Sequence, residues 1–212
     1  MGDSRGSSPY ELDEARAHRR SASVLKQQLI EQERQQFERT LAWAKDDVSL
    51  ERVAALIVSS RRRFVLGAAK SFTFASLLAA DLSSSLANVN LIDGTIVRPL
   101  DVLSDVRDSD VMIAISLARY RKYTVDFAVP FAEAGGTLVL ITDSPDAPLV
   151  SCASESIIVD TAGASPASSP VAVAFVIHAL AALATASAKG AGRRQRERDR
   201  IADSLGLYLD GS

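Results

Sequence analysis

Hydroxyl and cationic side chains gather in residues 116–124, directly after the apolar run 111–115. An unbroken apolar run that ends in a polar loop is typical of a strand buried on both faces of a parallel sheet. Such sheets bind ligands beyond the carboxyl ends of their strands, where helix N-termini and loop groups converge. The segment therefore predicts an anion site, most simply for a phosphate. Its candidate binding residues are Ser116, Arg119, Arg121 and Thr124.

A second loop with a hydroxyl group covers residues 67–71 and follows an earlier apolar segment. Gly67 and two alanines would let the backbone approach a ligand, Lys70 adds positive charge, and Ser71 would begin the next helix. The loop lacks the spacing of a nucleotide-binding glycine loop or a dinucleotide fingerprint. Taken alone it fits a tight turn in which Ser71 caps a helix. Paired with residues 116–124 on a neighbouring strand, it would enclose one phosphate.

Alternating apolar strands and helices must position these loops. The pattern predicts an α/β fold, a three-layer sandwich whose mainly parallel sheet of five strands is flanked by helices and joined by right-handed crossovers. Gly135 and Gly136 would close one of the helices. The strands are expected at 64–67, 90–92, 110–116, 137–142 and 156–159, and the helices between them at 72–86, 100–106, 123–134 and 171–187.

Helical segments flank this region on both sides. Residues 1–9 predict a disordered start, and residues 10–45 predict a long helix whose thin apolar stripe would lie on another surface, such as a second copy of the chain. A second helix begins at Ser49 and is expected to end near the basic triplet 61–63, and a last amphipathic helix is expected over 193–209. The predicted division is a start (1–9), a linker or dimerisation helix (10–48) and an α/β domain (49–212).

Composition narrows the class of protein. The 212 residues carry a net charge of −2, with one cysteine and two histidines, so neither a disulfide framework nor a cysteine-based metal cluster is expected, and no metal or cofactor is predicted. No basic-then-apolar leader opens the chain, which favours the cytoplasm. The apolar stretch 171–187 is rich in alanine and contains His178, so we interpret it as a buried helix rather than a membrane span.

Few residues suggest catalysis or nucleic-acid binding. Glu155 and His178 are the visible candidates for a general base, and His178 also fits a core position in an apolar helix. Cys152 is expected to be buried and inert. The arginines of residues 193–200 alternate with Glu197 and Asp199, which favours a solvated helix face over a nucleic-acid contact.

The two loops and their order resemble the sugar isomerase (SIS) domain, and most closely the effector domain of RpiR-type transcriptional regulators. The family's first loop follows a Gly-Xaa-Gly-Xaa-Ser pattern, which GAAKS matches at Gly67 and Ser71, with Ala69 at the second glycine. The second loop keeps Ser116, while Ala118, Arg119 and Arg121 replace a serine, a glycine and a threonine. The Arg119-Tyr120 pair resembles a variant within the family. The segment GGTLVLITDSPDAPL is similar to another family segment, and the resemblance spans about 45–190.

The resemblance implies a five-stranded parallel sheet that binds a sugar phosphate or a similar anionic metabolite. The long amphipathic N-terminal helix adds the expectation of a homodimer or larger homo-oligomer. The resemblance implies no catalytic residue, and DNA binding only if a helix-turn-helix domain is missing from this chain, since residues 10–45 lack a glycine-containing turn between short helices. Two alternatives remain: an aldose–ketose phosphosugar isomerase or related phosphosugar hydrolase, and a ligand-free dimerisation module.

Overall fold

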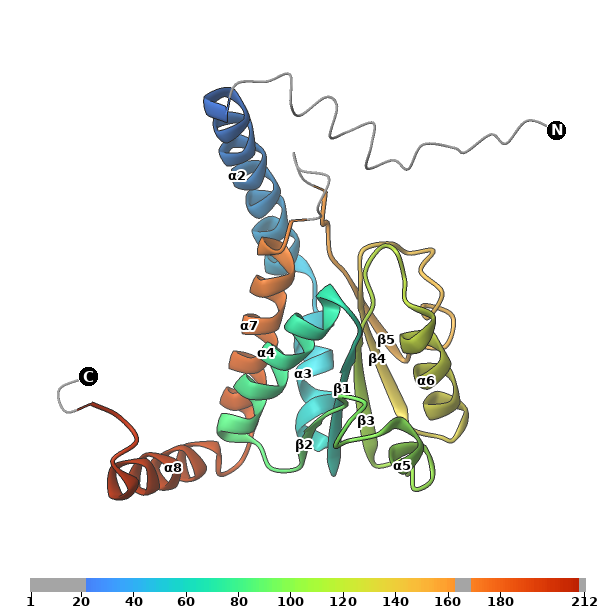
Figure 1. The fold of residues 1–212 in the computed structure, drawn as a ribbon, viewed down its shortest axis with the longest axis vertical. Helices are drawn as coiled ribbons and strands as arrows, with labels where there is room; N and C mark the ends of the chain where they lie inside the picture. Colours follow the sequence, from blue (N-terminus) through green and yellow to red (C-terminus); the bar gives the residue numbers. More distant parts are fainter. Residues whose placement is uncertain (1–21, 163–168, 210–212) are drawn as a thin grey trace.

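Five apolar segments form one parallel sheet with the strand order β2-β1-β3-β4-β5 (Figure 1). The structure is a computed structural model, and it describes residues 22–162 and 169–209. Almost all residues of the three central strands are buried, as expected for strands covered on both faces. The strands are β1 (Arg62–Gly67), β2 (Val89–Leu91), β3 (Asp110–Ile115), β4 (Thr137–Thr142) and β5 (Glu155–Ile158).

Helices cover both faces of the sheet and make the predicted three-layer α/β sandwich. On one face lie α3 (Ser49–Ser59), α4 (Lys70–Ser85) and α7 (Val171–Ser187), packed on alternate strand residues such as Ile113 and Ile141. On the other face lie α5 (Pro99–Leu103) and α6 (Lys122–Glu133), packed on the intervening residues such as Met112 and Leu140. The fold prediction is therefore confirmed, including the helix closure at Gly135, whose φ is 92°.

The strand order creates a switch point between β1 and β3. From β1 the chain crosses to β2 on one side, and it then returns to form β3 on the other side of β1. The loops that leave β1 and β3 consequently diverge at adjacent strand ends. This is where open α/β sheets bind their ligands.

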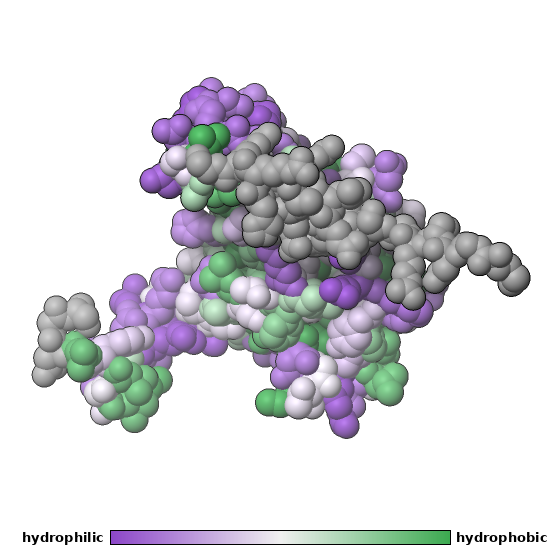
Figure 2. All heavy atoms as spheres, turned by 45° about the horizontal axis from the view of Figure 1, so that its top comes forward, coloured by the Kyte–Doolittle hydropathy of each residue, from purple (hydrophilic) through white to green (hydrophobic). Residues whose placement is uncertain are grey.

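A long helix, α2 (Ala22–Asp46), leads into the sandwich and projects from it at its outer end (Figure 1). Only Gln36 and Thr40 are buried, and Phe37 packs edge-to-face on Phe175 of α7 with ring centroids 5.7 Å apart. Figure 2 shows mainly hydrophilic side chains at the outer end of this helix. The expected helical residues 10–21 and the expected start 1–9 lie outside the described residues.

The basic triplet 61–63 follows the end of α3, as predicted, and leads into the first strand. Arg62 and Arg63 belong to β1, and α3 already ends at Ser59. Arg62 forms an ion pair with the fully buried Asp110, with 2.6 Å between Nη2 and Oδ2. Arg63 is buried and donates hydrogen bonds to the carbonyl oxygens of Ile57, Val58 and Ala87. Acceptors on neighbouring segments of the chain thus let cationic residues occupy a strand.

The last helix is shorter than predicted. α8 spans Ala191–Leu205 rather than 193–209, because Gly206 adopts a left-handed conformation (φ 59°) at its end. Arg198 contacts the body by donating to the carbonyl oxygen of Ser83. Within the described ranges, no single helix is both long enough and apolar enough to cross a membrane. Taken together, α7 and α8 meet these two criteria, but the pair is bent by 104°.

Candidate functional site

The 67–71 loop turns sharply from β1 into α4, and Gly67 makes this turn possible. A Cβ atom on Gly67 would lie 2.5 Å from the carbonyl oxygen of Ser71, so a side chain does not fit there. Ala69 has φ 53° and ψ −125°, a conformation that glycine adopts far more readily than alanine. Lys70 begins α4, and Ser71 lies buried in its first turn. The loop therefore places a hydroxyl group at a helix N-terminus.

The 116–124 loop begins one residue beyond β3. Ser116 continues the sheet pattern, since its backbone N–H donates to the carbonyl oxygen of Ile141 at 3.0 Å. Its hydroxyl oxygen is buried and has no hydrogen-bond partner within residues 22–162 and 169–209. Thr124 is buried in the first turn of α6, where its backbone N–H donates to the carbonyl oxygen of Arg121. A hydroxyl group of Ser116 that is buried without a partner costs about 1–3 kcal/mol, which a bound ligand would offset.

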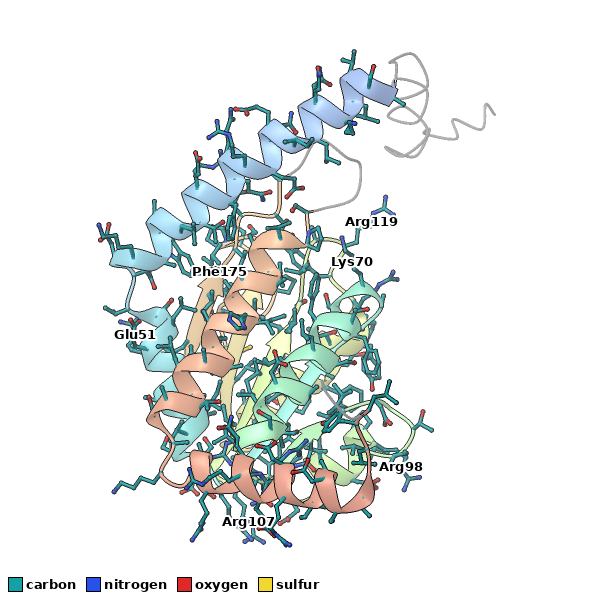
Figure 3. All side chains as sticks on the ribbon, turned by 90° about the vertical axis from the view of Figure 1, so that its left-hand side faces the viewer. Glu51, Lys70, Arg98, Arg107, Arg119 and Phe175 are labelled. Carbon is teal, nitrogen blue, oxygen red and sulfur yellow. The ribbon has the colours of Figure 1, made fainter. Side chains whose placement is uncertain are left out.

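The fold brings both loops to the same edge of the sheet. Gly67 pairs in register with Ile115, so the residues that follow them, Ala68 and Ser116, leave the sheet side by side. Figure 3 shows the labelled Lys70 and Arg119 together at this edge, whereas Arg107 lies at the opposite end of the molecule. Both α4 and α6 begin just beyond this edge, on opposite faces of the sheet, and helix N-termini attract anions.

The cationic residues of the second loop differ in their surroundings. Arg119 is exposed and has a left-handed backbone conformation, with φ 62°. Arg121 is exposed at the position that precedes α6. Lys122, which was not predicted to bind, forms an ion pair with Asp126 one turn along the helix, with 2.6 Å between Nζ and Oδ2. The two predicted arginines are thus exposed close to the end of β3.

Asp143 fixes the second loop, and sequence reasoning did not single it out. It follows β4, and its Oδ2 accepts a hydrogen bond from the backbone N–H of Ala118 at 2.8 Å. Its Oδ1 accepts one from the Tyr120 hydroxyl at 3.1 Å. Burial raises the pKa of Tyr120, and the neighbouring carboxylate of Asp143 raises it further, so the phenol keeps its proton. The run Ile-Thr-Asp at the end of an apolar strand is the signal that marks this residue.

The residues considered for catalysis lie elsewhere. Glu155 begins β5, at the amino end of a parallel strand, and pairs with Arg52 at 3.0 Å. His178 is exposed on α7, so the core position that the sequence suggested is wrong. Cys152 is half-buried rather than buried; burial raises the pKa of its thiol, which disfavours the reactive thiolate.

Across the described part of the chain, no three His, Cys, Asp or Glu side chains come close enough to hold a metal ion together. The 67–71 and 116–124 loops instead carry serine and threonine hydroxyls, helix N-termini and guanidinium groups. These groups bind anions by hydrogen bonding and charge.

Comparison with known proteins agrees with this geometry. The sequence model of the SIS domain matches residues 56–183. No curated protein sequence matches the chain significantly. Solved structures are similar in fold at low sequence identity. The RpiR transcription factor of Sphaerobacter thermophilus (sugar isomerase domain) is 24% identical, with a TM-score of 0.69, over 78% of this chain and 97% of that one.

Two further solved structures extend the comparison. NanR of Vibrio vulnificus, complexed with ManNAc-6P, is 17% identical with a TM-score of 0.70, over 86% of this chain and 69% of that one. A Methanococcus jannaschii protein, inferred to be a 3-hexulose-6-phosphate isomerase, is 13% identical with a TM-score of 0.61. The match covers 75% of this chain and 90% of that one. At these identities the likeness concerns the fold.

Proposed function

The chain belongs to the SIS domain family, and from this premise we propose that it is the phosphosugar-binding effector domain of an RpiR-type transcriptional regulator. In this proposal it senses a sugar phosphate or a related anionic metabolite and does not convert it. The observation that carries the proposal is that the 67–71 and 116–124 loops leave adjacent strand ends, at the switch point between β1 and β3.

The proposed phosphate contacts come from both loops. The small residues at 67–69 let the ligand approach the N-terminus of α4, where Ser71 offers a hydroxyl and Lys70 a charge. Ser116 and Thr124 offer hydroxyls from the second loop, and Arg119 and Arg121 take the places of uncharged family residues. A guanidinium group can hold two phosphate oxygens at once, so these arginines would replace hydroxyl contacts with charged ones.

Two similar structures favour sensing over catalysis. The Sphaerobacter thermophilus protein is a transcription factor, and the Vibrio vulnificus protein is complexed with a phosphorylated sugar, ManNAc-6P. The candidate base Glu155 is paired with Arg52 at the amino end of the sheet, and the candidate base His178 is exposed on α7. In the proposed role residues 10–48 form a linker and dimerisation helix ahead of the SIS domain at 49–212. In this role the protein would act as a homodimer in the cytoplasm. A DNA-binding domain would belong to a longer form of the protein.

A thermal-shift experiment tests the binding site. The wild type is screened against inorganic phosphate and a panel of pentose, hexose and amino-sugar phosphates, and one or more sugar phosphates is expected to raise its melting temperature. The double variant Ser71→Ala/Ser116→Ala should lose that shift. Ser76→Ala is the matched control, because Ser76 lies on the same helix and bonds only to the carbonyl oxygen of Phe72 among the described contacts. If the double variant keeps the full shift, the site is wrong.

Isomerase activity separates sensing from catalysis. The sugar phosphate that binds best is incubated with the protein, and its aldose and ketose forms are quantified over time. Unchanged substrate is expected. Turnover that is lost in Glu155→Ala or His178→Ala would make the protein an isomerase instead. If no phosphate compound binds but light scattering gives a stable dimer mass, the chain is a ligand-free dimerisation module.

A further inference from the structure

A pocket of about 410 Å³ lies between α2 and the carboxyl ends of β4 and β5. Its volume is within the range of small-molecule sites in proteins. The pocket is distinct from the 67–71 and 116–124 loops. Its wall is formed in part by α2, which lies outside the family match at residues 56–183. The lining residues are Arg39, Thr40, Trp43, Asp143, Ile158, Val159 and Asp160.

The lining has the chemistry that recognises a sugar ring. Trp43 offers a half-buried aromatic surface on which the C–H face of a pyranose can stack. The carboxylates of Asp143 and Asp160 accept hydrogen bonds from hydroxyl groups, and the guanidinium of Arg39 donates them. Ile158 adds an apolar wall that is 40% exposed. An aromatic surface surrounded by a few polar groups suits a polyhydroxylated ring better than an inorganic anion.

The pocket walls are held in place by contacts between α2 and the segment after β5. Arg39 pairs with Asp160 at 3.0 Å between Nη2 and Oδ2, and the side-chain amide of Gln36 donates to the carbonyl oxygen of Asp160. Burial opposes ionisation of Asp160, but the backbone N–H of Ala162 and the Arg39 guanidinium outweigh it and lower its pKa. The pocket therefore holds a charged, fixed carboxylate at neutral pH.

Asp143 links the pocket to the anion loops. It lines the pocket and at the same time holds the 116–124 loop through Ala118 and Tyr120. Adjacent strands lie about 4.8 Å apart, so two spacings, or about 10 Å, separate the β1–β3 switch point from the middle of the β4–β5 edge. Inorganic phosphate cannot span that distance, whereas a six-carbon sugar phosphate is of comparable length.

We propose that this pocket receives the ring of a hexose phosphate whose phosphate group rests on the 67–71 and 116–124 loops. The inference rests on the proposed function and adds the size class of the ligand. It also assigns the reading of the ring to Trp43 and Arg39 of α2. Specificity for the sugar would thus come from α2, a helix that lies outside the part of this chain that matches the SIS domain.

Isothermal titration calorimetry tests this assignment with inorganic phosphate, glycerol 3-phosphate and the 6-phosphates of glucose, fructose, glucosamine and N-acetylmannosamine. At least one hexose phosphate is expected to bind about tenfold or more tightly than inorganic phosphate, because the stacked ring and its hydrogen bonds contribute about 1.4 kcal/mol or more. Trp43→Leu and Arg39→Ala should each reduce this advantage about fivefold or more, with inorganic phosphate binding unchanged.

Two variants serve as controls. Arg34→Ala removes an arginine from the same helix that pairs with Glu31 and Glu38 instead of the pocket, and it should keep the full preference. Trp43→Phe keeps an aromatic surface, so it should keep most of the preference for hexose phosphate over inorganic phosphate. Thermal melting of each variant separates binding effects from unfolding.

The outcomes distinguish the two proposals. If hexose phosphates bind no better than inorganic phosphate, or if folded Trp43→Leu and Arg39→Ala keep the full preference, the pocket assignment is wrong while the anion site stands. If neither inorganic phosphate nor any sugar phosphate binds, the proposed function itself fails.

Discussion

Replacing Ala69 with glycine is expected to stabilise the protein, although glycine in place of alanine normally destabilises a fold. Ala69 has φ 53° and ψ −125°, a combination that residues with a Cβ atom rarely adopt. Holding such a residue in place costs about 1–3 kcal/mol. Its side chain is exposed, so removing the methyl group loses little packing. Glycine also stands at this position in the loop pattern of the family.

The expected gain follows from two opposing contributions. Relief of the backbone strain contributes about 1–3 kcal/mol. The extra conformational freedom of glycine in the unfolded chain costs about 0.4–1 kcal/mol. A net stabilisation of about 1 kcal/mol raises the melting temperature of a protein of this length by about 2–4 °C.

Differential scanning calorimetry of Ala69→Gly measures this gain against a matched control, Ala68→Gly. Ala68 precedes Ala69 in the same loop but is not among the described residues with positive φ, so the control should lower the melting temperature. The strain argument is refuted if Ala69→Gly lowers the melting temperature as Ala68→Gly does. A gain confined to Ala69→Gly would show that the first loop carries strain in its native form.

Two further predictions concern charged residues. Arg63→Leu should lower the free energy of unfolding measured in urea by on the order of 3 kcal/mol, because three carbonyl oxygens near the ends of α3 and α4 lose their donor. A loss below about 1 kcal/mol would contradict this role. Asp160 has a folded-state pKa below its unfolded value of about 3.9, so its contribution is present above about pH 4 and is lost as the pH falls through the folded pKa. The melting temperature of the wild type should therefore exceed that of Asp160→Asn at pH 7 and approach it at pH 3; a gap that does not shrink on acidification would contradict the pairing with Arg39.

The sheet was predictable from the sequence because its signal is local. β3 and β4 are unbroken apolar runs bounded by polar or glycine residues, and a strand buried on both faces needs no more than that. The placement of the 67–71 and 116–124 loops at one edge follows from the topology alone, since parallel strands put all their carboxyl ends on the same side. Element boundaries moved by one to three residues for most elements, as expected where caps rather than apolar runs decide the ends.

Features that depend on distant contacts could not be read from the sequence. Arg63 carries a charge in a run of three arginines, yet it is buried, because carbonyl oxygens at the end of α3 and just beyond α4 accept its hydrogen bonds. Gln36 and Asp160 are 124 residues apart and meet only in the folded chain. His178 lies in a helix of almost uniform hydropathy, in which the sequence gives no periodicity to separate the exposed face from the buried one.

The attachment of α2 determines how the anion site and the pocket would act together. Most of this helix is exposed, and polar contacts of Gln36, Arg39 and Glu33 hold much of the remainder. Polar contacts of this kind contribute about 1 kcal/mol each, and the edge-to-face contact of Phe37 with Phe175 adds about 0.5–1.5 kcal/mol, so the docking of α2 has a modest stability. A ligand that contacts Trp43 and Arg39 only when α2 is docked would shift that equilibrium by its difference in affinity for the two states, and 1–3 kcal/mol is typical of such coupling. Occupancy at the switch point would then be transmitted to the segment that precedes the SIS domain, because the same ligand would bridge both.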